Sequence, residues 1–91
     1  MKLYVITIEE IWDYDRLGHD PEVYVSQQVA RKRLAEIAEL ERPTYQEALE
    51  DSLVEEIYED MFEFYEDGCW AQTHLHAEIS ECELELTDKI G

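Results

Sequence analysis

The chain has 91 residues, with 24 Asp and Glu against 7 Lys and Arg, which gives a formal net charge of -17. Nucleic acids and anionic membranes are held by Lys and Arg, so this composition argues against direct binding to DNA, RNA or a membrane surface. The hydrophobic content of 45%, with 11% aromatic residues, is too high for a disordered chain. We therefore expect a single folded acidic domain over residues 1–91.

The chain carries no recognisable targeting signal. No apolar run approaches the roughly 18 residues that a membrane span needs. Cys69 and Cys82 are the only cysteines, too few for a secreted disulfide scaffold. We expect a cytoplasmic protein with reduced thiols.

The first half of the chain predicts two strands and a helix. Residues 3–14 form the first strand, because Tyr4, Ile6 and Ile8 fall on one face at a period of two. A turn-like stretch at 15–22 leads to a β-rich run at 23–25, and we expect these two runs to pair as a hairpin with a long loop. Ser26 is a good N-cap for a helix over 27–41, which Pro43 is expected to end.

The second half predicts another helix and a sheet segment. Thr44 and Glu47 match a capping box, which predicts a helix from 44 to about 67 with Gly68 as its C-terminal stop. Its buried stripe would consist of Tyr45, Leu49, Leu53, Ile57, Met61 and Phe64 or Tyr65. Residues 71–79 alternate in polarity, as in a strand covered on one side.

The apolar parity changes at Ser80 and Glu81, so a turn or bulge is expected there, followed by an apolar run at Cys82, Leu84 and Leu86. The predicted fold class is therefore α+β: a small antiparallel sheet, in the element order β-β-α-α-β-β, with two helices packed on one face. The order of the strands within the sheet does not follow from the pattern.

The acids are concentrated in the second half. Between Arg42 and Lys89 there is no Lys or Arg, yet this stretch holds 15 of the 24 acids. On a helix, one set of acids would form a ridge at i, i+4: Glu47, Asp51, Glu55, Glu59 and Glu63. Others would lie on its flanks: Glu50, Glu56, Asp60, Glu66 and Asp67.

Such a ridge would have the charge density of a polynucleotide. Residues 44–66 carry nine acids, which a helix spreads over about 34 Å, or about one charge per 3.8 Å. Phosphates of one DNA strand are about 3.4 Å apart along the axis. Tyr58 and Phe62 lie off the apolar stripe beside the ridge, so we expect them to be exposed anchors. They would serve equally well to pack a second copy, which leaves monomer and homodimer both open.

In size, acidity and this one helix, Glu47 to Asp67, the chain resembles the small acidic DNA-mimic inhibitors encoded by phages, of the anti-CRISPR type. The resemblance covers no family motif, so no residue roles transfer. It implies a stoichiometric inhibitor that occupies the cationic groove of a host nucleic-acid-binding protein or complex, such as a CRISPR effector. The contacts would be made by the acids of the ridge and its flanks, together with Tyr58 and Phe62.

Other readings of the same residues stand beside this one. An acidic face also serves an ordinary protein-protein interaction or structural module without mimicry, or adaptation to high salt. His74 and His76 have the spacing of a metal-binding pair, with Cys82 or His19 as a distant third ligand, but no further motif supports a metal site. We expect no metal, no cofactor and no enzyme. A dyad of Cys69 or Cys82 with a histidine could be drawn in any small protein with these residues, and no Gly-rich phosphate loop exists.

Overall fold

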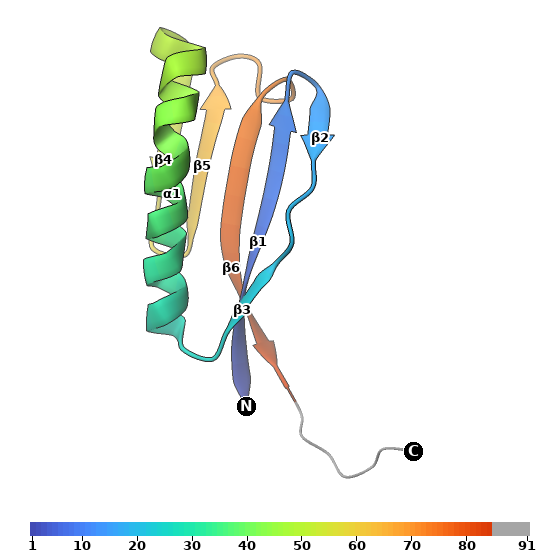
Figure 1. Cartoon of the computed structure of the whole chain (residues 1–91), viewed down its shortest axis with the longest axis vertical. Coiled ribbons are helices and arrows are strands. Elements are labelled where there is room, and N and C mark those ends of the chain that lie inside the picture. Colours follow the sequence, from blue (N-terminus) through green and yellow to red (C-terminus); the bar gives the residue numbers. More distant parts are fainter. Residues whose placement is uncertain (85–91) are drawn as a thin grey trace.

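The computed structural model describes residues 1–84, which form a six-stranded antiparallel sheet with one long helix across one face (Figure 1). The strands are β1 (Lys2–Trp12), β2 (Asp15–Leu17), β3 (Glu22–Tyr24), β4 (Leu53–Ile57), β5 (Met61–Glu66) and β6 (His74–Glu83). Helix α1 (Gln27–Leu49) leads into a single 3-10 turn, η1 (Glu50–Ser52). The strand order is β2-β1-β6-β5-β4, and β3 also pairs with β1.

The prediction of two helices in the order β-β-α-α-β-β is wrong. The segment expected to be the second helix contributes the end of α1, the turn η1 and the β4-β5 hairpin. Phe62 and Phe64 are both buried, while Glu63 between them lies on the other face of the sheet. A hairpin buries both rings at a period of two, and it separates acids that a helix would stack at i, i+4.

Pro43 does not end the helix, and Thr44 and Glu47 lie in its interior rather than in a capping box. Proline inside a helix removes one hydrogen bond and costs about 3 kcal/mol. The turn that follows is held by Tyr45, which is fully buried and packs edge-on against Trp12, with ring centroids 5.2 Å apart. Burial of this ring offsets the cost of the proline.

Several local predictions are confirmed. Strand β1 confirms the predicted strand as far as Trp12, and Asp13 and Tyr14 form the turn to β2 instead. It pairs antiparallel with β3, as expected, and β2 lies within the long connection between them. The Ser26 hydroxyl caps α1 by accepting a hydrogen bond from the Val29 amide at 3.3 Å. The bulge expected at Ser80 and Glu81 is wrong, because β6 keeps one unbroken register against β1. Leu86 lies outside the described residues.

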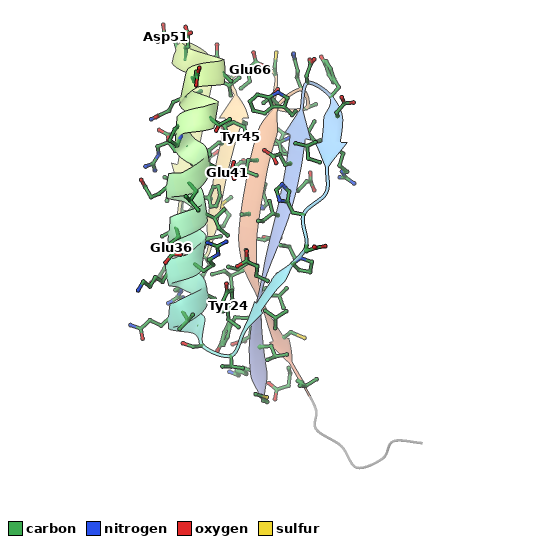
Figure 2. The ribbon with its side chains drawn as sticks, in the orientation of Figure 1. Tyr24, Glu36, Glu41, Tyr45, Asp51 and Glu66 are labelled. Atoms are coloured by element: carbon green, nitrogen blue, oxygen red, sulfur yellow. The ribbon has the colours of Figure 1, made fainter. Side chains whose placement is uncertain are left out.

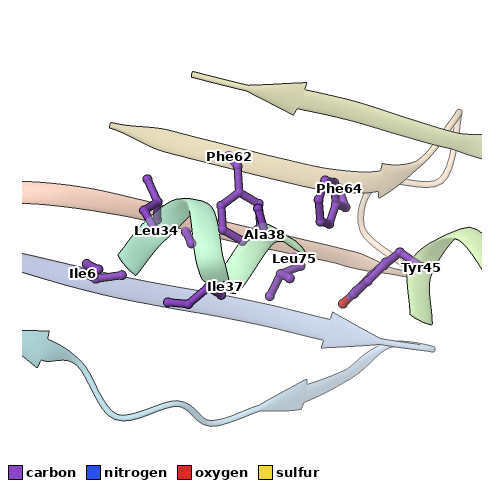
Figure 3. Close-up of a cluster of buried hydrophobic side chains, with 9 residues drawn as sticks. Ile6, Leu34, Ile37, Ala38, Tyr45, Phe62, Phe64 and Leu75 are labelled. Atoms are coloured by element: carbon purple, nitrogen blue, oxygen red, sulfur yellow. The ribbon is translucent and has the colours of Figure 1, made fainter. Parts of the chain in front are cut away.

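The core fills the space between α1 and the sheet (Figure 3). Its buried members come from α1 and from three adjacent strands: Ile6, Leu34, Ile37, Ala38, Tyr45, Phe62, Phe64, Leu75 and Ala77. Within residues 1–84, no element covers the opposite face of the sheet, which we call the open face. No helix in this described part combines the length and apolar character needed to cross a bilayer.

Candidate partner-binding surface

The predicted ridge of carboxylates does not exist, because its members belong to several elements that point in different directions. Glu47 is on α1, Glu50 and Asp51 are on η1, Glu55 and Glu56 are on β4, Glu59 and Asp60 are in the β4-β5 turn, Glu63 and Glu66 are on β5, and Asp67 follows it. The match to the phosphate spacing of DNA depended on one continuous helix. That match is therefore lost.

Acids near the β4-β5 hairpin are neutralised from within the chain. Arg31 donates from Nε to Asp60 Oδ1 at 2.7 Å, and its Nη1 lies 3.2 Å from Glu59 Oε1. Arg42 donates from Nε to Glu55 Oε1 at 2.8 Å. The hydrogen bonds from Arg31 lower the pKa of Asp60. These acids fasten α1 to the hairpin and are not available as a free anionic surface.

Glu63 takes part in a network on the open face. It accepts a hydrogen bond from Trp70 Nε1 at 3.1 Å, and its carboxylate lies 3.2 Å from His76 Nδ1. Glu56 is its direct cross-strand neighbour, and the hydrogen bond to Glu56 raises the pKa of Tyr65. The network gives Glu63 local partners and leaves two like charges facing each other.

The two predicted aromatic anchors differ. The Tyr58 side chain is 61% exposed, as expected. The expectation that Phe62 is exposed is wrong, because it is 1% exposed and packs against Phe64 in the core. Phe62 and Phe64 are two positions apart on β5, so the two rings share the covered face of the strand.

One group of acids has no ion-pair partner among residues 1–84, and we call it the acidic end. Its members are Asp13, Asp15, Glu47, Glu50, Asp51, Glu66 and Asp67. They lie where α1 ends, where β5 ends and where β1 turns into β2. The Asp67 amide donates to the Ser52 carbonyl at 2.7 Å, and the Tyr14 amide donates to the Gln72 carbonyl at 2.9 Å, so backbone contacts join these segments. Figure 2 shows Asp51 and Glu66 at this end of the molecule.

The acidic end places negative charge where the fold disfavours it. Glu47, Glu50 and Asp51 lie at the C-terminus of α1, whose last turn holds no basic residue. The helix dipole is negative there, and each acid costs about 0.3–1 kcal/mol. The nearby residues Asp13, Tyr14 and Glu50 all have left-handed backbone angles, with φ of 51°, 70° and 49°. Asp13 and Asp15 were not among the predicted site residues, because nothing in the sequence links the β1-β2 turn to the end of α1.

Two exposed aromatic rings accompany these acids. Tyr14, in the β1-β2 turn, is 71% exposed, and Trp70, in the β5-β6 connection, is 46% exposed. The Trp70 ring stacks on His74 with 3.9 Å between centroids. His74 Nδ1 lies 2.9 Å from the Trp70 carbonyl and Nε2 lies 3.1 Å from Glu9 Oε1. Both partners are acceptors, so both hydrogen bonds form only when His74 is protonated, and the ring then places a cation against Trp70.

The metal alternative gains no third ligand. His74 and His76 share the open face, as their spacing predicts, but each faces carboxylates of neighbouring strands. His19 lies 2.7 Å from Glu10 on the covered side, and Cys82 is an exposed free thiol. In the part of the chain that the structure describes, no group of three His, Cys, Asp or Glu side chains is arranged to hold a metal ion.

Comparisons with protein-family models, with curated proteins and with solved structures found no match. Function must therefore be inferred from the charges and geometry of the chain itself. The strongest asymmetry among the described residues is between the ion-paired arginines of α1 and the unpaired carboxylates of the acidic end.

Proposed function

We propose that this protein is a stoichiometric inhibitor whose acidic end occupies a cationic, nucleic-acid-binding surface of another protein or complex in the cytoplasm. The observation that carries the proposal is the division of charge. Every arginine forms an ion pair within the chain: Arg16, Arg31, Arg33 and Arg42. The acidic end, in contrast, keeps carboxylates that have no counter-ion among residues 1–84.

The extent of the acidic end suits such a surface. It reaches across the sheet from η1, beside β4, to the β1-β2 turn. Neighbouring strands are about 4.8 Å apart, so the four intervals of the order β2-β1-β6-β5-β4 span about 19 Å. One strand of duplex DNA places about six phosphates over that length. The acidic end thus presents an anionic array of nucleic-acid-like density on a broad surface instead of on a rod.

Binding a cationic surface would also relieve the unfavourable placement of these acids. A partner's Arg or Lys beside Glu47, Glu50 and Asp51 would provide the positive charge that the C-terminus of α1 lacks. Tyr14 and Trp70 are large exposed rings beside the acids. Such rings bind guanidinium groups by cation-π contact and serve often as interface anchors.

The test uses two variants with the same net charge. The first, Glu47→Gln with Glu50→Gln and Asp51→Asn, neutralises acids at the acidic end. The matched control, Asp20→Asn with Glu36→Gln and Glu81→Gln, neutralises three exposed acids elsewhere. Each protein is immobilised and used to capture partners from a lysate at low salt, with elution by a salt gradient. The captured partner is then assayed for nucleic-acid binding by mobility shift, with and without added inhibitor.

We expect stoichiometric loss of nucleic-acid binding with the natural chain and with the control variant, but not with the acidic-end variant. Elution should depend steeply on salt, because ionic contacts are screened over about 8 Å at physiological ionic strength. A captured partner that still binds nucleic acid in the presence of the chain would refute mimicry and support an ordinary interaction module. If both variants inhibited the partner equally poorly, total charge, and not the acidic end, would be responsible for the inhibition.

A further inference from the structure

We propose that the outer edge of β4 and the apolar groove beside it bind an extended segment of a partner protein, in which an aliphatic side chain is flanked by cationic residues. This surface is separate from the acidic end. Strand β4 is the last strand of the sheet, and within residues 1–84 no strand pairs with its outer edge. A free edge is a template for another strand.

The register shows which backbone groups face outward. The Asp67 amide bonds to the Ser52 carbonyl, and the Tyr58 amide bonds to the Met61 carbonyl at 2.8 Å, so Ser52 and Tyr58 face β5. Because antiparallel hydrogen bonding alternates, the backbone groups of Glu55 and Ile57 point away from β5. These groups have the geometry to pair with one added strand.

The groove lies on the covered side of the same edge. It has a volume of about 210 Å³, and its apolar lining comes from α1 and the hairpin: Leu34, Ala35, Ala38, Ile57 and Phe62. An engineered apolar cavity of about 150 Å³ holds a benzene molecule, so this groove has room for one large aliphatic side chain. Ile57 is 51% exposed, which shows that its apolar surface is not closed by the chain's own residues within 1–84.

The edge of β4 and the groove would bind the same residue of the partner segment. Side chains of Glu55 and Ile57 lie on the covered side of the sheet, since their β5 partners are Phe64 and Phe62. A residue paired with either of them would place its own side chain on that side, next to the groove. Its two neighbours in sequence would point to the open face.

Charge identifies the chemistry of those neighbours. On the open face, Glu56 lies directly opposite Glu63, and like charges in this position destabilise a sheet. Glu63 has His76 at 3.2 Å, whereas Glu56 has no ion-pair partner among the described residues. A Lys or Arg of the added strand would lie beside Glu56. The favoured segment therefore alternates cationic and aliphatic residues.

Charge also disfavours a second copy of this chain as the occupant. Pairing of β4 with β4 would bring Glu55 and Glu56 of two chains together, and each chain carries a net charge of -17. The close contact of these acids and the net charge of the two chains both oppose self-association. The occupant to which the geometry points is a basic segment of a different protein.

The probe is a short blocked peptide of alternating lysine and leucine, titrated into the full chain. A control peptide replaces leucine by serine and keeps the same charge. Ala35→Phe fills the groove from an exposed position on α1, and Ala48→Phe adds the same ring to an exposed position of α1 outside the groove. Affinity is measured by calorimetry, and protection of the Glu55 and Ile57 amides is followed by hydrogen exchange.

We expect the lysine-leucine peptide to bind at least about tenfold more tightly than the lysine-serine peptide, which corresponds to about 1.4 kcal/mol. Ala35→Phe should weaken binding of the lysine-leucine peptide by a similar factor, and Ala48→Phe should not. The Glu55 and Ile57 amides should become protected from hydrogen exchange when this peptide binds. Equal affinity for the two peptides would reduce the interaction to charge alone and overturn the proposal. Self-association that Ala35→Phe abolishes would make a second copy the occupant and would also overturn it.

The backbone contribution has its own test. Glu55→Pro removes an outward amide without breaking a bond to β5, while Glu55→Gln removes the same charge and keeps that amide. Peptide binding should be weaker in Glu55→Pro than in Glu55→Gln, with both variants folded by circular dichroism. Equal binding would exclude strand addition. The variants of Ala35 and Glu55 leave the residues of the acidic end unchanged, so failure here and failure of the proposed inhibition are separable.

Discussion

Replacing Tyr45 by Phe removes one buried oxygen and tests how the fold holds the buried carboxylate of Glu10. Tyr45 is fully buried, and Glu10 is only 8% exposed. The Tyr45 hydroxyl donates to Glu10 Oε2 at 2.6 Å, while His19 Nε2 lies 2.7 Å from Oε1. Each oxygen of the carboxylate thus has one partner, and the variant would leave Oε2 without its donor.

The magnitude follows from the charge on the acceptor. A hydrogen bond to a charged group contributes about 1.5–3 kcal/mol, and an unpaired buried acceptor bears its full desolvation cost. We expect Tyr45→Phe to lower the free energy of unfolding by about 2 kcal/mol. For a domain of this size, that loss lowers Tm by about 10 °C.

Urea unfolding followed by the fluorescence of Trp12 is a suitable assay, because its ring packs edge-on against Tyr45. A Trp70→Phe background removes the second indole. Tyr58→Phe is the matched control, since that hydroxyl is on an exposed ring. The loss caused by Tyr45→Phe should shrink in a Glu10→Gln background. A variant as stable as the natural chain, or one with the same loss in both backgrounds, would refute this account of Glu10.

Alkaline pH gives an independent signature of the same contact. Burial, and then the hydrogen bond to Glu10, raise the pKa of Tyr45 well above its usual range. Above about pH 10 the unfolded chain loses this proton while the folded chain keeps it, so stability falls as pH rises. The slope is about 1.4 kcal/mol per pH unit for one group. The stability gap between the natural chain and Tyr45→Phe should therefore narrow above pH 10; a constant gap would contradict the assignment.

Three further predictions concern the helix and the charges. Pro43→Ala restores an amide donor inside α1 and should raise the free energy of unfolding by about 2 kcal/mol in a thermal scan; no gain would contradict strain at this proline. Raising ionic strength from about 0.01 M to 0.1 M shortens the Debye length from about 30 Å to 10 Å, so urea unfolding should show higher stability, and a decrease would contradict self-repulsion. Arg31 lowers the pKa of Asp60, so the Asp60 carboxylate stabilises the fold at neutral pH, and this stabilisation is lost as pH falls below about 4. In an acid titration, the free energy of unfolding of Asp60→Asn should fall less steeply with pH than that of the control Asp20→Asn.

The parts of the fold that sequence predicted correctly depend on local signals. Strand β1 follows from alternation, and the start of α1 follows from the Ser26 cap. Leu34, Ile37 and Ala38 recur at helical spacing, and all three are buried on the side of α1 that faces the sheet, whereas Val29, at the same spacing near the start of α1, is exposed. Each of these features is decided by residues within one element.

The prediction of a second helix failed because the apolar residues of 53–66 fit both a helical and a strand period. Leu53, Ile57 and Phe64 fit a helical stripe, yet Phe62 and Phe64 also alternate as in a strand. What decides between them is not local: β5 lies between β4 and β6, and β6 comes from the end of the chain. Pairing with β6 buries both rings, and no pattern within 44–67 contains that information.

The same non-local pairing explains why the candidate site moved. The sequence gives the position of each acid along the chain, but in a β-hairpin neighbouring residues point to opposite faces of the sheet. Glu55, Glu59 and Asp60 consequently meet the arginines of α1, while Glu66 and Asp67 join η1 at the other end of β4. Position in sequence could not separate the paired acids from the unpaired ones.

The placement of cations bears on whether the acidity serves recognition or only a solvated surface. Arg31 and Arg42 join α1 to the β4-β5 hairpin, and Arg33 joins it to Glu22 of β3, which lowers the pKa of Glu22. The helix is thereby clipped to both sides of the sheet. A surface selected only for solvation would gain from a cation near the C-terminus of α1, where the helix dipole favours one. The chain instead gathers acids there, at a cost in stability that no cation in the last turn of α1 offsets.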